Sequence, residues 1–360
     1  MGDTISTANL RAKAFASQVW TEAQDELFHK RFIGKMEPTP DKATVDAFNN
    51  IIVMKENLLS PGQEHKGYQI TMPLAMKLSG AGVTGDGILE GSEEAIDTYD
   101  FTVTVDQWRN AVRQTGLADE YKVTYNTRML QKALLKINLK EHMEDEMTEA
   151  LSNSPTYSAT YVSNRHIYAG DATTVATLDD LTENTGNLFD VRAVQTARRL
   201  AKQAVPRIRP IMWEGKPYYV VLAHPWQIKS LHSSTTWQNA YYYAAERGDG
   251  NPIFSGADSV IDGVVIHEYT GIYTAASGAE LANDTASGDN TAAANVARAL
   301  FLGAQAGLYA IAKRPFWVEK FFDYGNKFGV ATGLIYEAAK TVWNSIDYGT
   351  IAIDTCTVPD

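Results

Sequence analysis

The chain has 360 residues, of which 44% are hydrophobic and 21% charged, enough to build one large core or two ordinary ones without disulfide or metal cross-links. Asp and Glu number 43 against 32 Lys and Arg, and the formal charge of −11 argues against a surface that neutralises phosphates with clustered cations. The single cysteine, Cys356, excludes an internal disulfide framework and leaves an intermolecular bridge or an inert thiol.

The first part of the chain reads as an arm. Charged and polar groups run through its first thirty residues, so we expect no signal-peptide core, and no stretch approaches the ~20 apolar residues of a membrane span. Residues 8–32 have a moderately amphipathic helical pattern that ends near Gly34. Residues 1–66 hold too little apolar bulk for a core of their own and should pack on something else. The large apolar residues of the helical pattern are Leu10, Val19, Trp20, Leu27 and Phe28.

The next segment, residues 67–106, predicts a long β-hairpin. Apolar and polar residues alternate with period two over residues 68–78 and again over 98–106. The intervening residues 79–97 are rich in glycine and acids and form a connection far longer than an ordinary hairpin turn.

A hairpin with one apolar face needs a cover, and we expect another subunit to supply it. On that interpretation, replacing Ile70 and Phe101 with Asp leaves the subunit folded and blocks assembly.

The strongest helical pattern runs from Asn126, a plausible N-cap, to Asn153, where Ser154 and Pro155 stop it. At ~1.5 Å per residue its roughly 27 residues would span about 40 Å, which is typical of a spine and not of a packing helix in a small domain. The residues that mark its apolar stripe are Leu130, Leu134, Ile137, Met147 and Leu151.

The second half of the chain mixes strands and helices, with a boundary at Pro206 and Pro210 and a compact α/β segment after it. Residues 274–297 have almost nothing to bury and predict a mobile loop. Alanines interrupt the alternation near the C-terminus, and residues 331–340 look helical. The other elements that we expect are a helix near 191–204, a strand at 218–222, a short helix from His224 to Leu231, and a hairpin over 260–268 that turns at Asp262 and Gly263.

One motif resembles a nucleotide-binding fingerprint. Residues Gly80 to Gly85 match G-x-G-x-x-G and follow a strand, as that motif requires. The fingerprint also needs a helix at its third glycine, whereas acids beginning at Asp86 follow here and would repel a phosphate. A P-loop is excluded because no Lys-Ser/Thr pair follows the glycines, so we interpret the segment as a flexible acidic loop tip.

The other candidate groups also favour structural roles. His224 and His232 could pair in catalysis, but no nucleophile motif accompanies them, and Glu93 with Glu94 does not match calcium-loop spacing. We expect hydrogen-bonded histidines and a solvated or partner-facing acidic tip. The seven histidines, which show no zinc motif, are His29, His65, His142, His166, His224, His232 and His267.

An aromatic cluster could stack single-stranded bases, but no basic stripe accompanies it, so core or interface packing is favoured. We therefore predict no catalytic residue, no cofactor and no metal site, and a protein that is not an enzyme. The aromatic cluster consists of Trp237, Tyr241, Tyr242 and Tyr243.

The order of these elements resembles the major capsid proteins of tailed bacteriophages with the Hong Kong 97-type fold, specifically the N-four-like coat proteins. No single motif is decisive, but their order is fairly specific. The resemblance covers most of the chain and rests on residues 89–94 leading into 101–109, the long helix after Arg128, residues 221–231, 252–256, 261–265 and 299–306.

The resemblance implies an α+β capsid fold in five segments. Alanine-rich residues 331–340 would be strand in this fold. The implied segments are an N-terminal arm (1–66), an extended hairpin loop (67–108), a peripheral domain (109–210) with the spine helix at about 126–153, an axial domain (211–322), and C-terminal strands that return to the peripheral domain (323–360).

The resemblance also implies a function. Copies would form hexamers and pentamers of an icosahedral head around double-stranded DNA, with no sequence-specific binding and no membrane. The expected partners are other copies, a separate scaffolding protein, a portal protein and, as a further candidate, a decoration protein. The expected location is the virion, after assembly in the bacterial cytoplasm. The alternatives are a bacterial nanocompartment shell protein of the same fold and a nucleotide-binding α/β enzyme.

Overall fold

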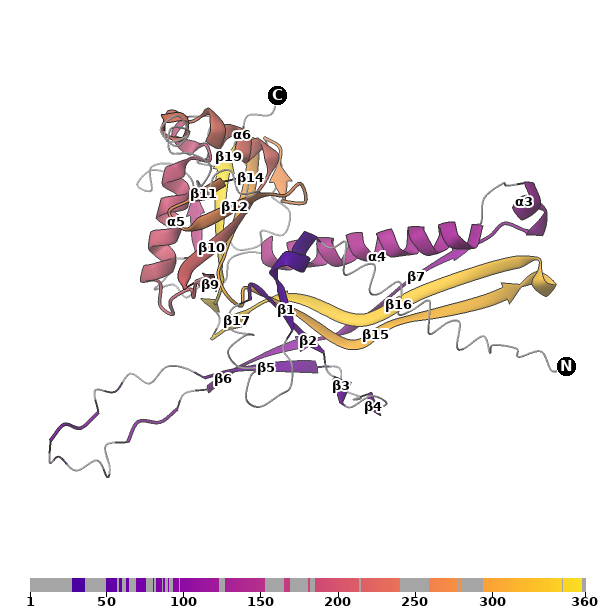
Figure 1. Cartoon of the computed structure of the whole chain (residues 1–360), viewed down its shortest axis with the longest axis horizontal. Helices are drawn as coiled ribbons and strands as arrows, with labels where there is room; N and C mark the ends of the chain where they lie inside the picture. The colour runs from indigo at the N-terminus through magenta and orange to yellow at the C-terminus, as the bar shows by residue number, and fades with distance from the viewer. Residues whose placement is uncertain are drawn as a thin grey trace.

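The structure of the chain is a computed structural model. Its described residues form a compact unit from which a long helix and a sheet of long strands project side by side (Figure 1). The described residues are 28–35, 50–56, 58–59, 63–64, 69–75, 80, 82–85, 87, 90, 93–96, 98–122, 127–152, 165–168, 181, 185–213, 215–239, 259–277, 279, 294–344 and 346–357.

The projecting part is built on a five-stranded sheet with the order β1-β2-β15-β16-β7. β15 and β16 form a long antiparallel hairpin, β7 pairs antiparallel with β16, and β2 pairs parallel with both β15 and β1. The elements of this part are β1 (Ile33–Lys35), β2 (Ile52–Glu56), β7 (Asp106–Arg113), β15 (Gly307–Phe322), η5 (Asp323–Gly325) and β16 (Lys327–Lys340).

The alanine-rich residues 331–340 are therefore strand, as the family resemblance implied, and the helical interpretation is wrong. The physical reason is that β16 is covered on both faces near its C-terminal end. Leu334 and Ala338 pack on the side of the long helix, whereas Ile335 and Ala339 pack on the opposite side. A strand buried on both faces does not alternate between apolar and polar residues.

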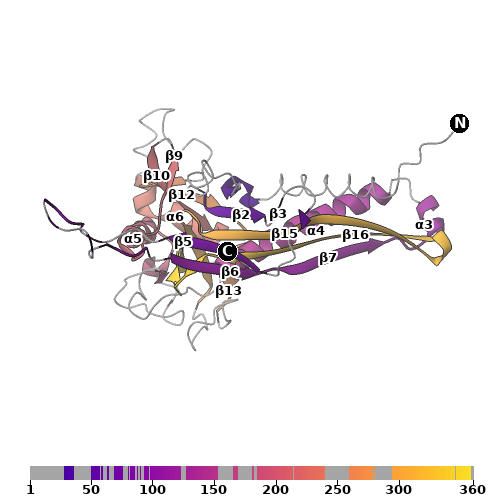
Figure 2. The same ribbon diagram turned by 90° about the horizontal axis from the view of Figure 1, so that it is seen from below.

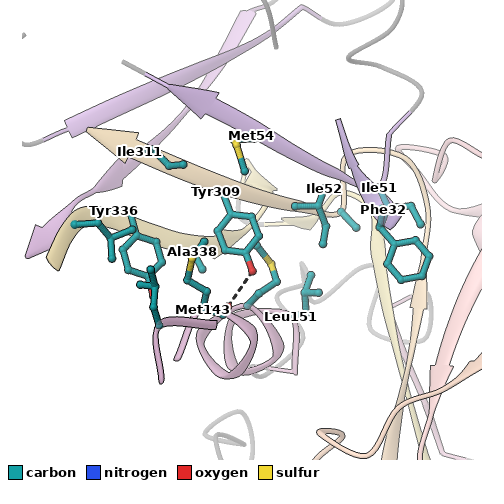
Figure 3. Close-up of a cluster of buried hydrophobic side chains, with 14 of the residues drawn as sticks. Phe32, Ile51, Ile52, Met54, Met143, Leu151, Tyr309, Ile311, Tyr336 and Ala338 are labelled. Carbon is teal, nitrogen blue, oxygen red and sulfur yellow. Dashed lines mark hydrogen bonds between the residues drawn. The ribbon is translucent and has the colours of Figure 1, made fainter. Parts of the chain in front are cut away.

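Helix α4 (Thr127–Ser152) lies along one face of this sheet and closely matches the expected spine (Figure 2). Its buried side chains pack with β2, β15 and β16, and the hydroxyl of fully buried Tyr309 donates a 2.9 Å hydrogen bond to the Met143 carbonyl (Figure 3). The buried apolar residues of α4 are Leu135, Leu139, Met143, Met147 and Leu151.

The expected apolar stripe of this helix is only partly correct. Met147 and Leu151 are buried, but Leu130, Leu134 and Ile137 are 42%, 49% and 43% exposed. Apolar residues lie on two faces of the first half of α4, and a 3.6-residue period fits either face equally well. The spacing alone could not say which face meets the sheet.

The compact unit holds an eight-stranded sheet with β10 (Lys216–Ala223) near its centre, and α5 (Val191–Gln203) and α6 (Pro225–Ser233) pack on it. The main order is β11-β12-β10-β14-β19-β8, with β9 on β10 and β13 on β14. The other strands are β8 (His166–Tyr168), β9 (Ile211–Trp213), β11 (Ser259–Ile261), β12 (Val264–Glu268), β13 (Thr274–Ala275), β14 (Val296–Leu302) and β19 (Thr350–Cys356).

Local expectations for this unit are confirmed. The turn of the β11–β12 hairpin falls on Asp262 and Gly263, whose φ values are 49° and 78° as a two-residue hairpin turn requires. Cys356 is fully buried in β19, which favours the inert thiol over an intermolecular bridge. The mobile loop expected over 274–297 is wrong at both ends, which are paired in β13 and β14, and most of its middle lies outside the described residues.

Strand pairing joins parts of the chain that the expected segments keep apart. β15 lies in the long sheet although it precedes residue 323, and β19 pairs with β14 in the compact unit and not with the long sheet. Helix α5 packs against residues of β10, β14 and β19, so it also belongs to the compact unit. The chain crosses repeatedly between the two parts, which a division into consecutive segments cannot represent.

The remaining described elements are short, apart from the β5–β6 hairpin. None of the described helices is both long and apolar enough to cross a membrane. The helix expected over 8–32 lies mostly outside the described residues, and its last part is the 3-10 turn η1. These elements are η1 (Phe28–Phe32), β3 (Leu58–Leu59), β4 (Gln63–Glu64), β5 (Gln69–Ala75), β6 (Thr98–Thr104), α3 (Leu117–Lys122), η3 (Thr185–Asn187), β17 (Val342–Trp343) and β18 (Ile346–Asp347).

Candidate assembly surfaces

The β5–β6 hairpin packs on the face of the long sheet opposite α4 (Figure 2). The predicted alternation is confirmed in β6, where Thr98, Asp100, Thr102 and Thr104 are exposed and the residues between them are buried or half-buried. The Phe101 ring also meets Trp343 edge to face at 6.0 Å. The buried residues of this cluster are Val53, Ile70, Met72, Val103, Val105, Leu308, Ala310, Trp343 and Tyr348.

This packing corrects the expectation that another subunit covers the apolar face of the hairpin. Ile70, at 2% exposed, is buried by its own chain, as is Val103 opposite it. Period-two alternation shows that a face must be covered but carries no information on which chain covers it. Replacing Ile70 and Phe101 with Asp would therefore place charge in the core of the subunit itself.

The described residues of the loop between β5 and β6 lack the helix that a nucleotide-binding fingerprint needs. Gly82 and Gly85 have φ values of 67° and 69°, and no described residue between them and Ile96 is helical. The Gly80 amide donates instead to the Glu94 carboxylate at 2.6 Å. The motif thus forms an exposed acidic loop, as the sequence predicted.

The described residues of this loop lie at the opposite end of the molecule to the tip of the β15–β16 hairpin, in both views (Figures 1 and 2). That tip carries a surface of the opposite charge. We call it the distal basic face: the side away from α4, formed by the outer parts of β7, β15 and β16. Its cationic residues are Arg109, Arg113, Lys320 and Lys327.

Aromatic rings hold the cationic side chains of the distal basic face in place. The register places Lys320 opposite Gly329 and Gly329 opposite Arg113, so the three lie side by side. The Phe322 ring lies across Gly329, where a Cβ atom would come within 2.9 Å of it. Lys320 and Arg113 stack on Phe322 at 5.0 and 5.7 Å, which holds their charges at the surface. Exposed Val318 lies on the same face.

A buried ion pair joins α4 to the compact unit. Arg298 of β14 donates to both carboxylate oxygens of Asp354 at 2.8 and 2.7 Å, and also to the Ser152 carbonyl in the last turn of α4 at 3.0 Å. His166 Nε2 lies 2.6 Å from the same carboxylate. Burial alone would raise the pKa of Asp354, but the charges and hydrogen bonds of Arg298 and His166 outweigh it and hold this pKa well below its usual range. Because Asp354 and Arg298 have no exposed surface, the group has the features of a structural link and not of a reaction centre.

A second charged group lies on β16. Burial, together with the charges of Glu146, Asp106 and Glu149, raises the pKa of Glu337 to about 7. His142 Nε2 is 2.8 Å from Glu146 and its ring stacks on Trp108.

Within the described part of the chain, no group of three or more His, Cys, Asp and Glu side chains is arranged to hold a metal ion.

The other candidate residues have structural roles where they are described. His224 caps α6: its Nδ1 accepts from the Trp226 amide at 3.3 Å, and the Gln227 side chain accepts from the His224 amide. His232 lies in the last turn of α6 and stacks on Trp237, which is buried in the compact core. The two histidines therefore do not meet. Tyrosines 241–243 lie outside the described residues.

The fold and these surfaces define a class of protein, namely shell-building subunits with the Hong Kong 97-type fold. The capsid of Ralstonia phage GP4 matches with a TM-score of 0.71 and 24% identity over 92% of this chain and 91% of its own. The Cyanophage Pam1 capsid matches with a TM-score of 0.71 and 21% identity over 92% of each chain. A major capsid protein of Pseudomonas phage KPP25 is 27% identical over 96% of this chain and 95% of its own length.

The family described as phage capsid protein matches residues 1–358, and the chain belongs to that family. It is a major capsid protein of a tailed phage. This match disfavours both alternatives, the nanocompartment shell and the nucleotide-binding enzyme. The narrower N-four-like branch stays a prediction.

Proposed function

We propose that the chain forms hexamers and pentamers of an icosahedral head that encloses double-stranded DNA, and that it is a structural protein of this shell with no catalytic role. The observation that carries the proposal is the separation of the acidic loop and the distal basic face to opposite ends of the subunit. Two surfaces of opposite charge that lie at opposite ends of one copy cannot meet within it, which favours contact between neighbouring copies.

The charges of the two surfaces are complementary. The loop sequence holds Asp86, Glu90, Glu93, Glu94 and Asp97, and no Lys or Arg occurs between residues 78 and 108. The described glutamates of the loop are exposed, as are Arg109, Arg113 and Lys320 on the distal basic face. Opposite potentials steer encounter and suppress wrong orientations.

The loop of one copy should therefore lie over the distal basic face of the next. Such a contact is heterologous, joining different surfaces on the two partners, and heterologous contacts close into rings when the rotation between copies permits. Hexamers and pentamers are rings of this kind. The same chain covers the apolar face of the β5–β6 strands. In this proposal the acidic loop between the strands, and not the strands themselves, therefore makes the contact between copies.

The remaining partners follow from the family resemblance. A separate scaffolding protein would guide assembly in the bacterial cytoplasm, a portal protein would occupy one vertex, and a decoration protein could bind the finished shell. The net charge of −11 favours a wall that does not bind the enclosed DNA tightly.

The proposal is tested by charge reversal. The double variant Glu93→Lys and Glu94→Lys should reduce the yield of closed particles seen by electron microscopy, as should Lys320→Glu with Lys327→Glu. Combining all four should restore particles, because the attraction is re-formed with opposite sign. Lys216→Glu, at an exposed site on the compact unit, is the control.

Stable monomers of the unmodified chain at all concentrations, with the phage's scaffolding protein present, would contradict the proposal. A thermal shift with NAD or ATP would support the enzyme alternative instead. Unchanged particle yield in both double variants would show that the loop and the distal basic face are not in contact.

A further inference from the structure

Helix α5 presents a line of polar side chains to solvent, most of them cationic. Four exposed residues are separated by three, four and three positions, so they follow one line along the helix surface. The opposite side of α5 is buried on the eight-stranded sheet. We call this line the α5 basic stripe, and its residues are Arg192, Gln195, Arg199 and Lys202.

Two further arginines widen the stripe. Arg198 is half-buried on the same helix. The chain after the helix returns to its last turn, where the Ile208 amide donates to the Ala201 carbonyl at 3.1 Å, so exposed Arg207 lies beside α5. Burial raises the pKa of Tyr219, and the charges of Arg198 and Arg207 both oppose that rise, so both cations lie near its hydroxyl.

Positive charge is concentrated here although the whole chain is acidic. Residues 191–213 hold six of the 32 Lys and Arg and no Asp or Glu, in a chain with a net charge of −11. Asp262 offsets part of this charge, because its carboxylate accepts from Gln195 at 3.0 Å and lies 4.0 Å from Arg198. Phosphate binding depends on clustered cations and not on the charge of the whole chain, so the stripe is a local exception to the acidic balance.

The chemistry of the stripe favours phosphates over a protein surface. The cores of protein interfaces are apolar and rich in aromatic residues, and the distal basic face has this character because Phe322 and Val318 lie among its cations. The α5 basic stripe consists of three cations and an amide, which are groups that contact the phosphate oxygens of nucleic acids. Exposed Val205 lies beyond the end of the helix.

The stripe is long enough to meet several phosphates at once. From Arg192 to Lys202 is ten residues, or about 15 Å at ~1.5 Å per residue. Duplex DNA carries one negative charge per about 1.7 Å of its axis. Helix α5 lies on the side of the compact unit away from the tip of the β15–β16 hairpin, so the stripe is separate from the distal basic face (Figures 1 and 2).

We propose that the α5 basic stripe binds the phosphates of the enclosed duplex DNA without reading its sequence, and that this side of the compact unit faces the interior of the head. The inference rests on the proposed function, which supplies the enclosed DNA. Contacts from Arg192, Arg199, Lys202 and Arg207 amount to about four phosphates per copy, fewer than the six to ten of a tight DNA-binding protein. Each copy therefore holds the DNA weakly, in agreement with the net charge of the chain.

Fluorescence anisotropy of a short labelled duplex of arbitrary sequence, titrated with unassembled subunits, tests the proposal. With about four phosphate contacts, the logarithm of the binding constant should fall with the logarithm of salt concentration with a slope of about −3.6. That slope corresponds to a loss on the order of a hundredfold between about 50 and 200 mM salt. Arg192→Gln with Arg199→Gln should bring the slope to about −1.8.

The matched control removes the same charge from the distal basic face. Arg113→Gln with Lys320→Gln should leave the slope at the value of the parent, and all four of these side chains are exposed, so neither pair of substitutions opens a core. Equal slopes in the two double variants, or no binding of the duplex by the parent at about 50 mM salt, overturn the proposal.

A labelled peptide with the sequence of residues 79–97 serves as the acidic protein probe. If it binds the parent more tightly than the duplex does, and Arg192→Gln with Arg199→Gln removes that binding, the occupant of the stripe is an acidic protein segment and the assignment to DNA is overturned.

Modification of arginines by phenylglyoxal in DNA-filled and emptied heads tests the orientation. Arg192 and Arg199 should react severalfold more slowly in filled heads, and Arg113 at the same rate in both. Equal rates at Arg192 and Arg199 overturn the placement of the stripe against the DNA. Particle formation is scored separately by electron microscopy. Duplex binding by subunits that never form particles counts against the proposed function only, and particles whose subunits do not bind the duplex count against this inference only.

Discussion

Replacing Ile70 with Ala tests whether the extended hairpin is part of the folded subunit. Ile70 is 2% exposed and lies between the hairpin and the long sheet, in a cluster with Val53, Leu308 and Trp343. Truncating a fully buried Ile to Ala costs about 2–5 kcal/mol through lost burial and the cavity that remains. Because hairpin and sheet both line this site, we expect a loss of about 3 kcal/mol in the free energy of unfolding.

The assay is urea unfolding of the isolated subunit, followed by tryptophan fluorescence, because Trp343 contacts the hairpin. Thr71→Ala is the control: Thr71 is on the exposed face of the same strand, and its hydroxyl lies 3.3 Å from that of Thr102 in an exposed position. It should change stability by less than about 0.5 kcal/mol.

If Ile70→Ala leaves the stability of the subunit within that same margin but prevents assembly, the reasoning is refuted. A neighbouring subunit, and not the chain itself, would then be the cover of the hairpin. The double replacement of Ile70 and Phe101 with Asp is now expected to destabilise the subunit, since it places one charge in the core at Ile70 and a second at half-buried Phe101.

Three further predictions concern polar groups that are buried or half-buried. Asp354→Asn should lower the free energy of unfolding, measured in urea, by about 3–5 kcal/mol, because it leaves the Arg298 guanidinium buried without a counter-charge. Asp262→Asn, at an exposed site, is the control and should lower it little. A loss in Asp354→Asn as small as that of the control would show that the ion pair does not stabilise the subunit. Glu337 has a pKa raised from 4.5 to about 7, so its native form holds the proton more tightly and its contribution to stability is lost as pH rises through 7. Glu337→Gln should therefore be more stable than the parent by about 1 kcal/mol at pH 8, a value reduced because the side chain is about half exposed, and should differ little from the parent at pH 4.5. Thermal melts at the two pH values measure this, with Glu90→Gln as the control. Equal effects at both pH values would argue against the raised pKa. Tyr309→Phe should cost about 1 kcal/mol by removing the hydrogen bond to the Met143 carbonyl, and an unchanged melting temperature would contradict that role.

Features set by near neighbours in the chain could be predicted from the sequence. The limits of α4 agree with the expected 126–153 to within about one residue, because Asn126, a residue type that favours N-caps, and Pro155 flank the helical pattern in the sequence. The turn at Asp262 and Gly263 follows from residues that accept positive φ. The role of His224 as a helix cap fits its position directly before Pro225.

Features set by distant parts of the chain could not be predicted. Alternation around Ile70 shows that a face is buried, but the cover comes from residues more than two hundred positions away, such as Leu308. The same holds for β19, whose pairing with β14 decides to which part it belongs. The distal basic face combines residues of β7, β15 and β16, and no local pattern brings Arg113 beside Lys320.

Because α4 and the β15–β16 hairpin project side by side, a small change of angle where they join the compact unit would move their far ends by a large distance. Helix α4 has 26 residues, so its far end is about 39 Å from the last turn, where Arg298 holds the Ser152 carbonyl. A tilt of about 10° at that fulcrum would displace the far end by about 7 Å. Small changes in the angle between the projection and the compact unit would therefore be large at the tip.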